Sequence, residues 1–226
     1  MFSYEGMMRI NTALRSVYRL AYLNLLWLAT TVLGLVVFGI GPASYAMAAY
    51  IDGWFRRGQT PPVTRAFFGH VRTQYWRSVA MGVILSGATV IVVTNIFSVG
   101  TWLLQFANIV ALAVIAVIAA YVFPVMAATD VRGIPRQIAA ALMLGVGSLH
   151  WTIVAGAVVA GLVWLLYACA LPLLVLFGVG IPAAAVGFVT RIVFGQLSAS
   201  DAQTSPSPRA RETSRTHLHL ARGTTE

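Results

Sequence analysis

A small set of polar side chains interrupts the long apolar stretches of this chain, and these residues could do chemistry. Amide and ionisable groups are costly inside a membrane and are commonly functional there. The set is Asn24, Asp52, Asn95, Gln105, Asn108, His150 and Arg191. Hydrogen bonding and ion pairing are the chemistry that these residue types offer. Asn24 and Asn108 are candidates for hydrogen bonds between helices.

Asp52 and Arg191 raise a sharper question, because each carries a charge near the end of a short apolar segment. An ion pair between them would connect two parts of the chain that are far apart in sequence. The alternative is that each side chain extends to the membrane surface and pairs with nothing. Asp130 and Arg132 follow another apolar block, and we expect them at the cytoplasmic surface as further polar candidates.

Catalytic and metal-binding motifs are missing from the sequence. It contains no His-Glu-x-x-His, Gly-x-Ser-x-Gly or Walker pattern and no close pair of carboxylates. The single cysteine, Cys169, lies in an apolar stretch, and His217 and His219 lie in a polar tail. We therefore expect no enzyme, no cofactor and no metal site, although an intramembrane enzyme assembled from distant segments stays a remote alternative.

The composition indicates an integral membrane protein. Hydrophobic residues make up 59% of the chain, charged residues 9%, and the mean hydropathy is +0.82, whereas soluble domains carry about 25% charged residues. The net charge of +9 does not indicate a nucleic-acid partner, because the arginines flank apolar runs and do not cover a soluble face. Arginine supplies all 15 basic residues.

The distribution of arginines predicts a topology. We expect an all-α bundle of six spans arranged as three hairpins, in a bacterial inner membrane, with both termini and every arginine in the cytoplasm. The predicted spans are 20–38, 43–55, 79–95, 102–126, 151–177 and 182–194. Five spans result if 43–55 lies in the membrane interface. Gly41 and Pro42 mark the turn of the first hairpin.

Outside the spans, the sequence predicts surface helices and a polar tail. Segments 62–77 and 134–150 are expected to form short amphipathic elbows that lead into spans. On the first, the arginines would face anionic lipid headgroups while Phe67, Phe68, Tyr75 and Trp76 lie at the interface. The bundle is expected to occupy residues 1–197. Residues 198–226, rich in Ser, Thr, Pro and Arg, are predicted to be a disordered cytoplasmic tail.

A short motif occurs twice, near the start of two predicted spans. Phe38-Gly-Ile-Gly-Pro42-Ala43 is echoed by Phe177-Gly-Val-Gly-Ile-Pro182-Ala183. A repeated hairpin and coincidence in a glycine-rich apolar chain are both open explanations.

Several motifs resemble the YesL-like family of bacterial membrane proteins. They are Asn24-Leu-Leu-Trp27-Leu, Gly41-Pro42-Ala43, Ala66-Phe67-Phe68 and Tyr121-Val-Phe-Pro124 with Asp130, and the resemblance extends over residues 2–195. It implies a polytopic protein of unknown function, without known catalytic residues, from a family whose genes often occur beside genes for carbohydrate uptake and glycoside breakdown.

This resemblance favours a non-enzymatic accessory component of carbohydrate uptake or utilisation, with sugar transporter subunits as partners. A stand-alone transporter of small solutes is the alternative, supported by the echoed motif and the Gly-Pro-interrupted short helices. The oligomeric state stays open.

Overall fold

The computed structural model describes residues 4–98, 100–129, 133–169, 173 and 177–204, and these residues are almost entirely helical. The helices are α1 (Tyr4–Leu33), α2 (Ile40–Arg57), α3 (Val63–Thr73), α4 (Tyr75–Ser98), α5 (Trp102–Ala128), α6 (Ile134–Gly147), α7 (Leu149–Cys169) and α9 (Gly180–Thr204). The all-α prediction is confirmed. Residues 1–191 form one compact unit, and α9 continues beyond it, past Ser198, where the predicted tail begins.

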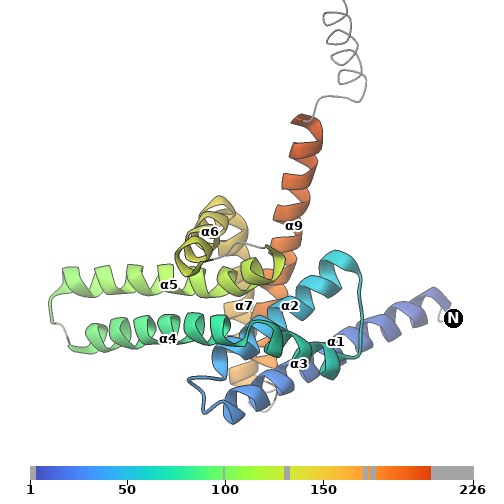
Figure 1. The fold of residues 1–226 in the computed structure, drawn as a ribbon, viewed down its shortest axis with the longest axis horizontal. Coiled ribbons are helices and arrows are strands. Elements are labelled where there is room, and N and C mark those ends of the chain that lie inside the picture. Colours follow the sequence, from blue (N-terminus) through green and yellow to red (C-terminus); the bar gives the residue numbers. More distant parts are fainter. Residues whose placement is uncertain (1–3, 99, 130–132, 170–172, 174–176, 205–226) are drawn as a thin grey trace, which may run out of the picture. The chain divides into compact units, whose positions relative to one another are not determined.

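The second predicted hairpin is confirmed as a pair of helices, although α4 extends beyond the predicted 79–95 at both ends. Helices α4 and α5 lie side by side in Figure 1 and pack along their lengths. Both are strongly apolar, and the residues between them carry no charge. Pro124 lies inside α5. Because proline has no N–H, the carbonyl of Ala120 lacks its usual helical donor.

The first hairpin differs from the prediction in where it turns. Helix α1 begins at Tyr4, well before the predicted span 20–38, and continues without a break to Leu33. The turn that follows contains Leu35 and Val36 at φ values of 53° and 64°. Gly41 and Pro42 lie within the first turn of α2 and not in the loop. Proline is tolerated there because the first helical N–H groups have no intrahelical acceptor.

The prolines of the two echoed motifs occupy the same position in their helices. Pro42 is the third residue of α2, and Pro182 is the third residue of α9. Each proline therefore occupies a position where its missing N–H costs nothing. This agreement leaves open whether the two hairpins arose by duplication.

Helix α2 is the most enclosed element of the bundle, in contact with α1, α3, α4 and α5. Its buried face joins Leu23 and Phe67 in the main apolar cluster, whose other members are Ala43, Ala46, Met47, Tyr50 and Ile51. The predicted interfacial position of Phe67 is wrong, since this side chain is completely buried. Phe67 faces α2 because α3 must cover that helix, whereas the neighbouring Phe68 is exposed.

Helix α2 ends at a glycine in the left-handed conformation. Gly58 has φ +63°, and its N–H donates to the carbonyl of Gly53. Glycine is the residue that adopts this left-handed conformation without steric cost. Arg56 and Arg57 occupy the last turn, where positive charge interacts favourably with the helix dipole.

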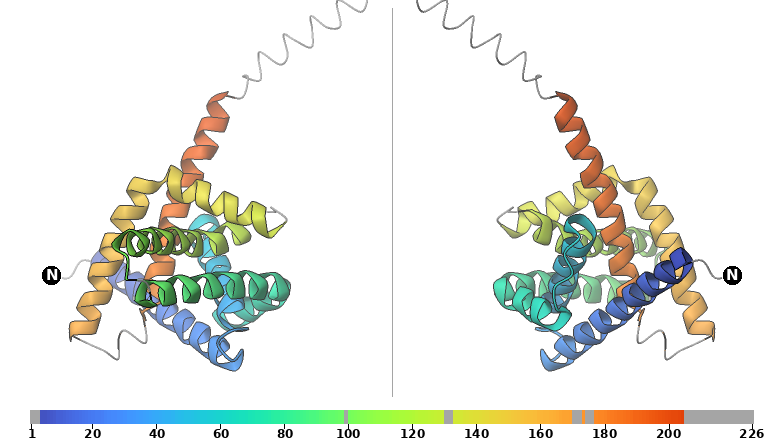
Figure 2. Two further views of the ribbon diagram at one scale, coloured as in Figure 1. Left: turned by 90° about the vertical axis from the view of Figure 1, so that its left-hand side faces the viewer. Right: turned by 90° about the vertical axis from the view of Figure 1, so that its right-hand side faces the viewer.

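Both predicted elbows are separate helices. The short helix α3 precedes α4, and a break at Ser148 separates α6 from α7, which meet at a sharp angle in both views of Figure 2. The start of α7, just after this elbow, contacts α5, where the Tyr121 hydroxyl lies 2.7 Å from the Thr152 hydroxyl. A Cβ at Gly145 would also overlap Val117, so α5 and α6 approach closely.

Three of the described helices are long and apolar enough to cross a membrane: Tyr75–Ser98, Trp102–Ala128 and His150–Ala168. They are α4, α5 and most of α7. The segment Gly180–Val193 is a shorter apolar helix. These helices support a membrane protein, while six spans and their orientation stay predictions.

The crossing of α2 and α4 depends on two glycines. A Cβ at Gly82 would lie 2.7 Å from the Gly41 Cα atom, and a Cβ at Gly41 would overlap the Ser78 carbonyl. Contacts this short cannot form without moving one helix. The backbones therefore touch because neither position carries a side chain.

We predict that Gly82→Ala destabilises the protein by about 1–3 kcal/mol because it overpacks this crossing. Gly87→Ala is the matched control, since it is on the same helix and a Cβ there would meet nothing within 4 Å. Both changes raise helix propensity equally. Thermal unfolding in mild detergent should show a lower midpoint for Gly82→Ala, and equal midpoints would contradict the close crossing.

Candidate functional site

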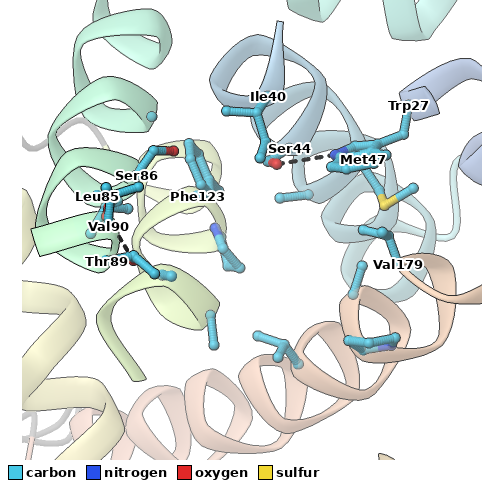
Figure 3. A pocket seen from close by; sticks show the side chains of 18 residues that line it. Trp27, Ile40, Ser44, Met47, Leu85, Ser86, Thr89, Val90, Phe123 and Val179 are labelled. Carbon is cyan, nitrogen blue, oxygen red and sulfur yellow. Dashed lines mark hydrogen bonds between the residues drawn. The ribbon is translucent and has the colours of Figure 1, made fainter. Parts of the chain in front are cut away.

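A cavity of about 510 Å³ lies among α1, α2, α4, α5 and the start of α9. Figure 3 shows side chains from these helices surrounding an open space. Trp27, Met47, Leu85 and Phe123 supply large parts of its wall. The volume is within the range of small-molecule sites, which are usually apolar with a few polar groups that orient the ligand.

Hydroxyl groups are the polar side chains on this wall. The Trp27 indole N–H donates to the Ser44 hydroxyl oxygen at 3.1 Å. Thr89 donates to the Leu85 carbonyl at 2.8 Å. Ser86 is the third hydroxyl residue, and its oxygen is visible beside the open space in Figure 3. The described lining residues include no ionisable side chain, so the cavity suits an apolar or uncharged ligand.

The proline of α5 adds a backbone group to the same wall. Ala120 and Pro124 both line the cavity, and the Ala120 carbonyl is the one that Pro124 leaves without a helical donor. A free carbonyl in an apolar environment is a hydrogen-bond acceptor for a ligand hydroxyl. Pro124 therefore leaves a carbonyl acceptor in a helix that borders the cavity, whose described lining residues carry no charge.

Asn24 connects α1 to α9. Its side-chain oxygen accepts hydrogen bonds from the backbone N–H groups of Val179 and Gly180, at 3.2 and 3.1 Å. These N–H groups lie at the start of α9, where the helix offers no internal acceptor. Asn24 is 3% exposed, so the predicted hydrogen bond between helices is confirmed. It acts as an N-cap supplied from another helix.

The hypothesis that Asp52 pairs with Arg191 is wrong. Asp52 is 7% exposed, and its carboxylate lies 2.8 Å from the Arg56 guanidinium and 3.6 Å from that of Arg57. Arg56 is one helical turn away, so the local pair forms without ordering a distant side chain. Arg191 is exposed on α9.

Other polar candidates are scattered. Asn108 is half-buried on α5, while Asp130 and Arg132 lie outside the described residues. Within the described part of the chain, no hydrogen bond or ion pair identified above joins two of the predicted candidates. Trp164 is 71% exposed on α7.

The cavity hydroxyls were not singled out by sequence. Serine and threonine are ordinary residues in apolar helices, where they usually bond to their own backbone. The Gly-Pro signal near Pro42 and the aromatic Trp27 were the cues that lay closest to the cavity. The convergence of α4 and α5 on this space depends on tertiary packing.

One histidine near the arginine-rich end has a perturbed environment. Burial lowers the pKa of His70 on α3, and the positive charge of Arg57 lowers it further. The neutral imidazole is therefore favoured in the folded protein. His70 belongs to α3, outside the predicted spans.

The long apolar helices α4, α5 and α7 indicate a helical membrane protein, and two of them, α4 and α5, line the cavity. The chain belongs to the DUF624 family, described as proteins of unknown function, whose profile matches residues 20–96. The predicted YesL-like membership is thereby confirmed.

Relatives in Bacillus subtilis strain 168 support the same membership. The uncharacterized protein YteU is 31% identical over 155 residues, which cover 66% of this chain and 69% of YteU. The uncharacterized protein YesL is 39% identical over 69 residues, covering 30% of this chain and 33% of YesL. YesV, also uncharacterized, is 34% identical over 94 residues, which cover 41% of this chain and 45% of YesV. No solved structure matches this chain.

We predict that Asn24→Leu destabilises the protein by about 0.5–2 kcal/mol, because it removes the cap of α9. Asn24→Asp should recover part of this stability, since a carboxylate oxygen can accept the same bonds. Asn108→Leu is the control for removing an asparagine from an apolar helix. The measurement is the thermal midpoint in detergent. Equal effects of Asn24→Leu and Asn108→Leu would contradict the capping role.

Proposed function

We propose that this protein is a non-enzymatic accessory subunit or assembly factor of a bacterial carbohydrate uptake system. The substrate class rests on the family resemblance, whose members often occur beside genes for carbohydrate uptake. The role as a subunit rests on one structural observation, the exposed surface of α7. In the proposed topology six spans place both termini and the arginines in the cytoplasm, so that Arg65 and Arg72, exposed on α3, face anionic headgroups.

Helix α7 supports assembly with another membrane protein. It is apolar throughout, and no residue of its His150–Ala168 window is buried within this chain. Ala157 and Gly161 lie one turn apart on the same face of α7, and a Cβ at Gly161 would meet nothing within 4 Å. Glycines on an apolar helix allow a second helix to approach closely and gain packing contacts. A permease span is a suitable occupant of this surface.

We predict that the protein copurifies with a sugar permease or its ATPase from native membranes in mild detergent. Gly161→Leu should reduce the recovered partner because the larger side chain blocks close helix approach. Gly87→Leu on α4 is the control, as it adds the same side chain at another open position. Both variants should remain monodisperse. Recovery of the native protein alone in several mild detergents would contradict the proposal.

A second candidate function, transport of small uncharged solutes, is favoured by the cavity. Its hydroxyl side chains are suited to sugar hydroxyl groups, and helix interruptions often accompany binding sites in transporters. The lack of charge among the described lining residues is compatible with an uncharged solute and offers no group for ion coupling.

We predict that, if this second function holds, the purified protein mediates uptake of labelled mono- or disaccharides into liposomes. Ser86→Phe should abolish uptake by filling the cavity. Ser98→Phe, at the exposed end of the same helix, should leave it unchanged. Uptake no faster than in empty liposomes for every sugar tested would reject this candidate while leaving the accessory role intact.

A further inference from the structure

A second pocket, of about 570 Å³, lies between α1 and the segment that joins α2 to α3. Arg15, Tyr18 and Arg19 line it from α1, and Thr60, Pro61 and Pro62 line it from the other side. It is separate from the apolar cavity, with which it shares no lining residue. Four of its side chains can donate hydrogen bonds, two through guanidinium groups and two through hydroxyl groups.

The two arginines of this pocket are arranged to attract an anion. Arg15 and Arg19 are one helical turn apart, so they lie on the same face of α1, where like charges repel. The ion pairs found within the described residues both involve Asp52, and neither reaches Arg15 or Arg19. An anion bound between the two guanidinium groups would turn this repulsion into attraction.

Aromatic contacts hold the pocket in place. The Arg19 guanidinium lies 5.7 Å from the centre of the Trp54 ring, a distance suited to a cation–π interaction. Tyr18 stacks on Tyr22 with ring centres 6.1 Å apart, and the Tyr22 hydroxyl lies 2.9 Å from the Thr64 hydroxyl on α3. Arg19 is therefore positioned before any ligand binds.

The residue types around the pocket are those found at the headgroup level of a bilayer. Tyrosine and tryptophan concentrate at the headgroup level of a bilayer. Leu14, 64% exposed, and the half-buried Val63 add apolar surface to the pocket wall. This combination of paired guanidinium groups, aromatic rings and apolar flank matches a lipid, in which phosphate and hydrocarbon are joined.

We propose that this pocket binds the phosphate of an anionic phospholipid. Arg15 and Arg19 contact the phosphate oxygens, because guanidinium groups bind phosphate through paired hydrogen bonds. The Thr60 and Tyr18 hydroxyls contact the remaining headgroup oxygens. Leu14 and Val63 contact the beginning of the acyl chains. The bound lipid connects α1 to the α2–α3 segment, from which both walls of the pocket come.

The test uses the full chain in nonionic detergent and native mass spectrometry with dihexanoyl phosphatidylglycerol as the probe. The double variant Arg15→Gln/Arg19→Gln should bind it at least about tenfold more weakly, because charge-assisted hydrogen bonds are lost. Arg136→Gln/Arg191→Gln, at exposed positions of α6 and α9 outside this pocket, is the control, as it removes the same charge and should change binding less than twofold. Equal weakening in both would overturn the proposal in favour of general attraction.

Further arms separate the lipid from other sources of phosphate. Dihexanoyl phosphatidylcholine should bind more weakly, because its choline cation is repelled by the arginines. Inorganic phosphate should compete poorly because it lacks hydrocarbon. If inorganic phosphate displaces the bound probe as effectively as unlabelled lipid does, the lipid assignment is overturned.

A conservative variant guards against misfolding. Arg15→Lys/Arg19→Lys keeps both charges and loses the paired hydrogen-bond geometry. Its affinity should lie between those of the native protein and the glutamine variant. An affinity equal to that of the native protein would show that charge alone suffices and would overturn the bidentate contact.

Discussion

The close packing of α2 is the constraint on which the rest of the described bundle depends. This helix must accommodate α1, α3, α4 and α5 around it, and small residues make that possible. Gly41 allows the backbone of α4 to approach, and Gly187 on α9 lies against Ile51 and Phe55. Because α2 occupies the centre, α4 and α5 keep broad exposed apolar faces, as expected for helices in contact with lipid.

The same small residues explain the cavity. Ser44 and Ala48 of α2, Ala120 of α5 and Ala183 of α9 line it, and none is large enough to fill the space between helices that diverge. Asn24 stabilises the start of α9 at one side of this space, and Trp27, one turn further along α1, bonds to Ser44. Cavity shape and helix capping are thus linked through α1, so a change in the position of α9 would alter the cavity.

Local signals predicted much of the fold. The apolar spans predicted at 79–95 and 102–126 located α4 and α5, because hydrophobic length is a local property of the sequence. The turn at Leu35 and Val36 was missed because neither residue is a usual turn former. For Asp52 the nearby Arg56 prevailed over the distant Arg191. Asn24 was recognised as polar, but its partner and the cavity depend on the tertiary position of α9.

The central claim, that α2 packs directly against α9, is tested most directly by oxidative cross-linking in native membranes. With Cys169 replaced by alanine, cysteines at Ile51 and Gly187 should form a disulfide, because their side chains would be in contact. After cleavage at a protease site inserted behind the exposed Gly100, this disulfide should keep the two fragments joined. As a control, the two fragments of the variant with cysteines at Ile51 and at Gly161 on α7 should separate after cleavage. Separated fragments in the first variant, together with joined fragments in the second, would contradict the packing of α2 against α9.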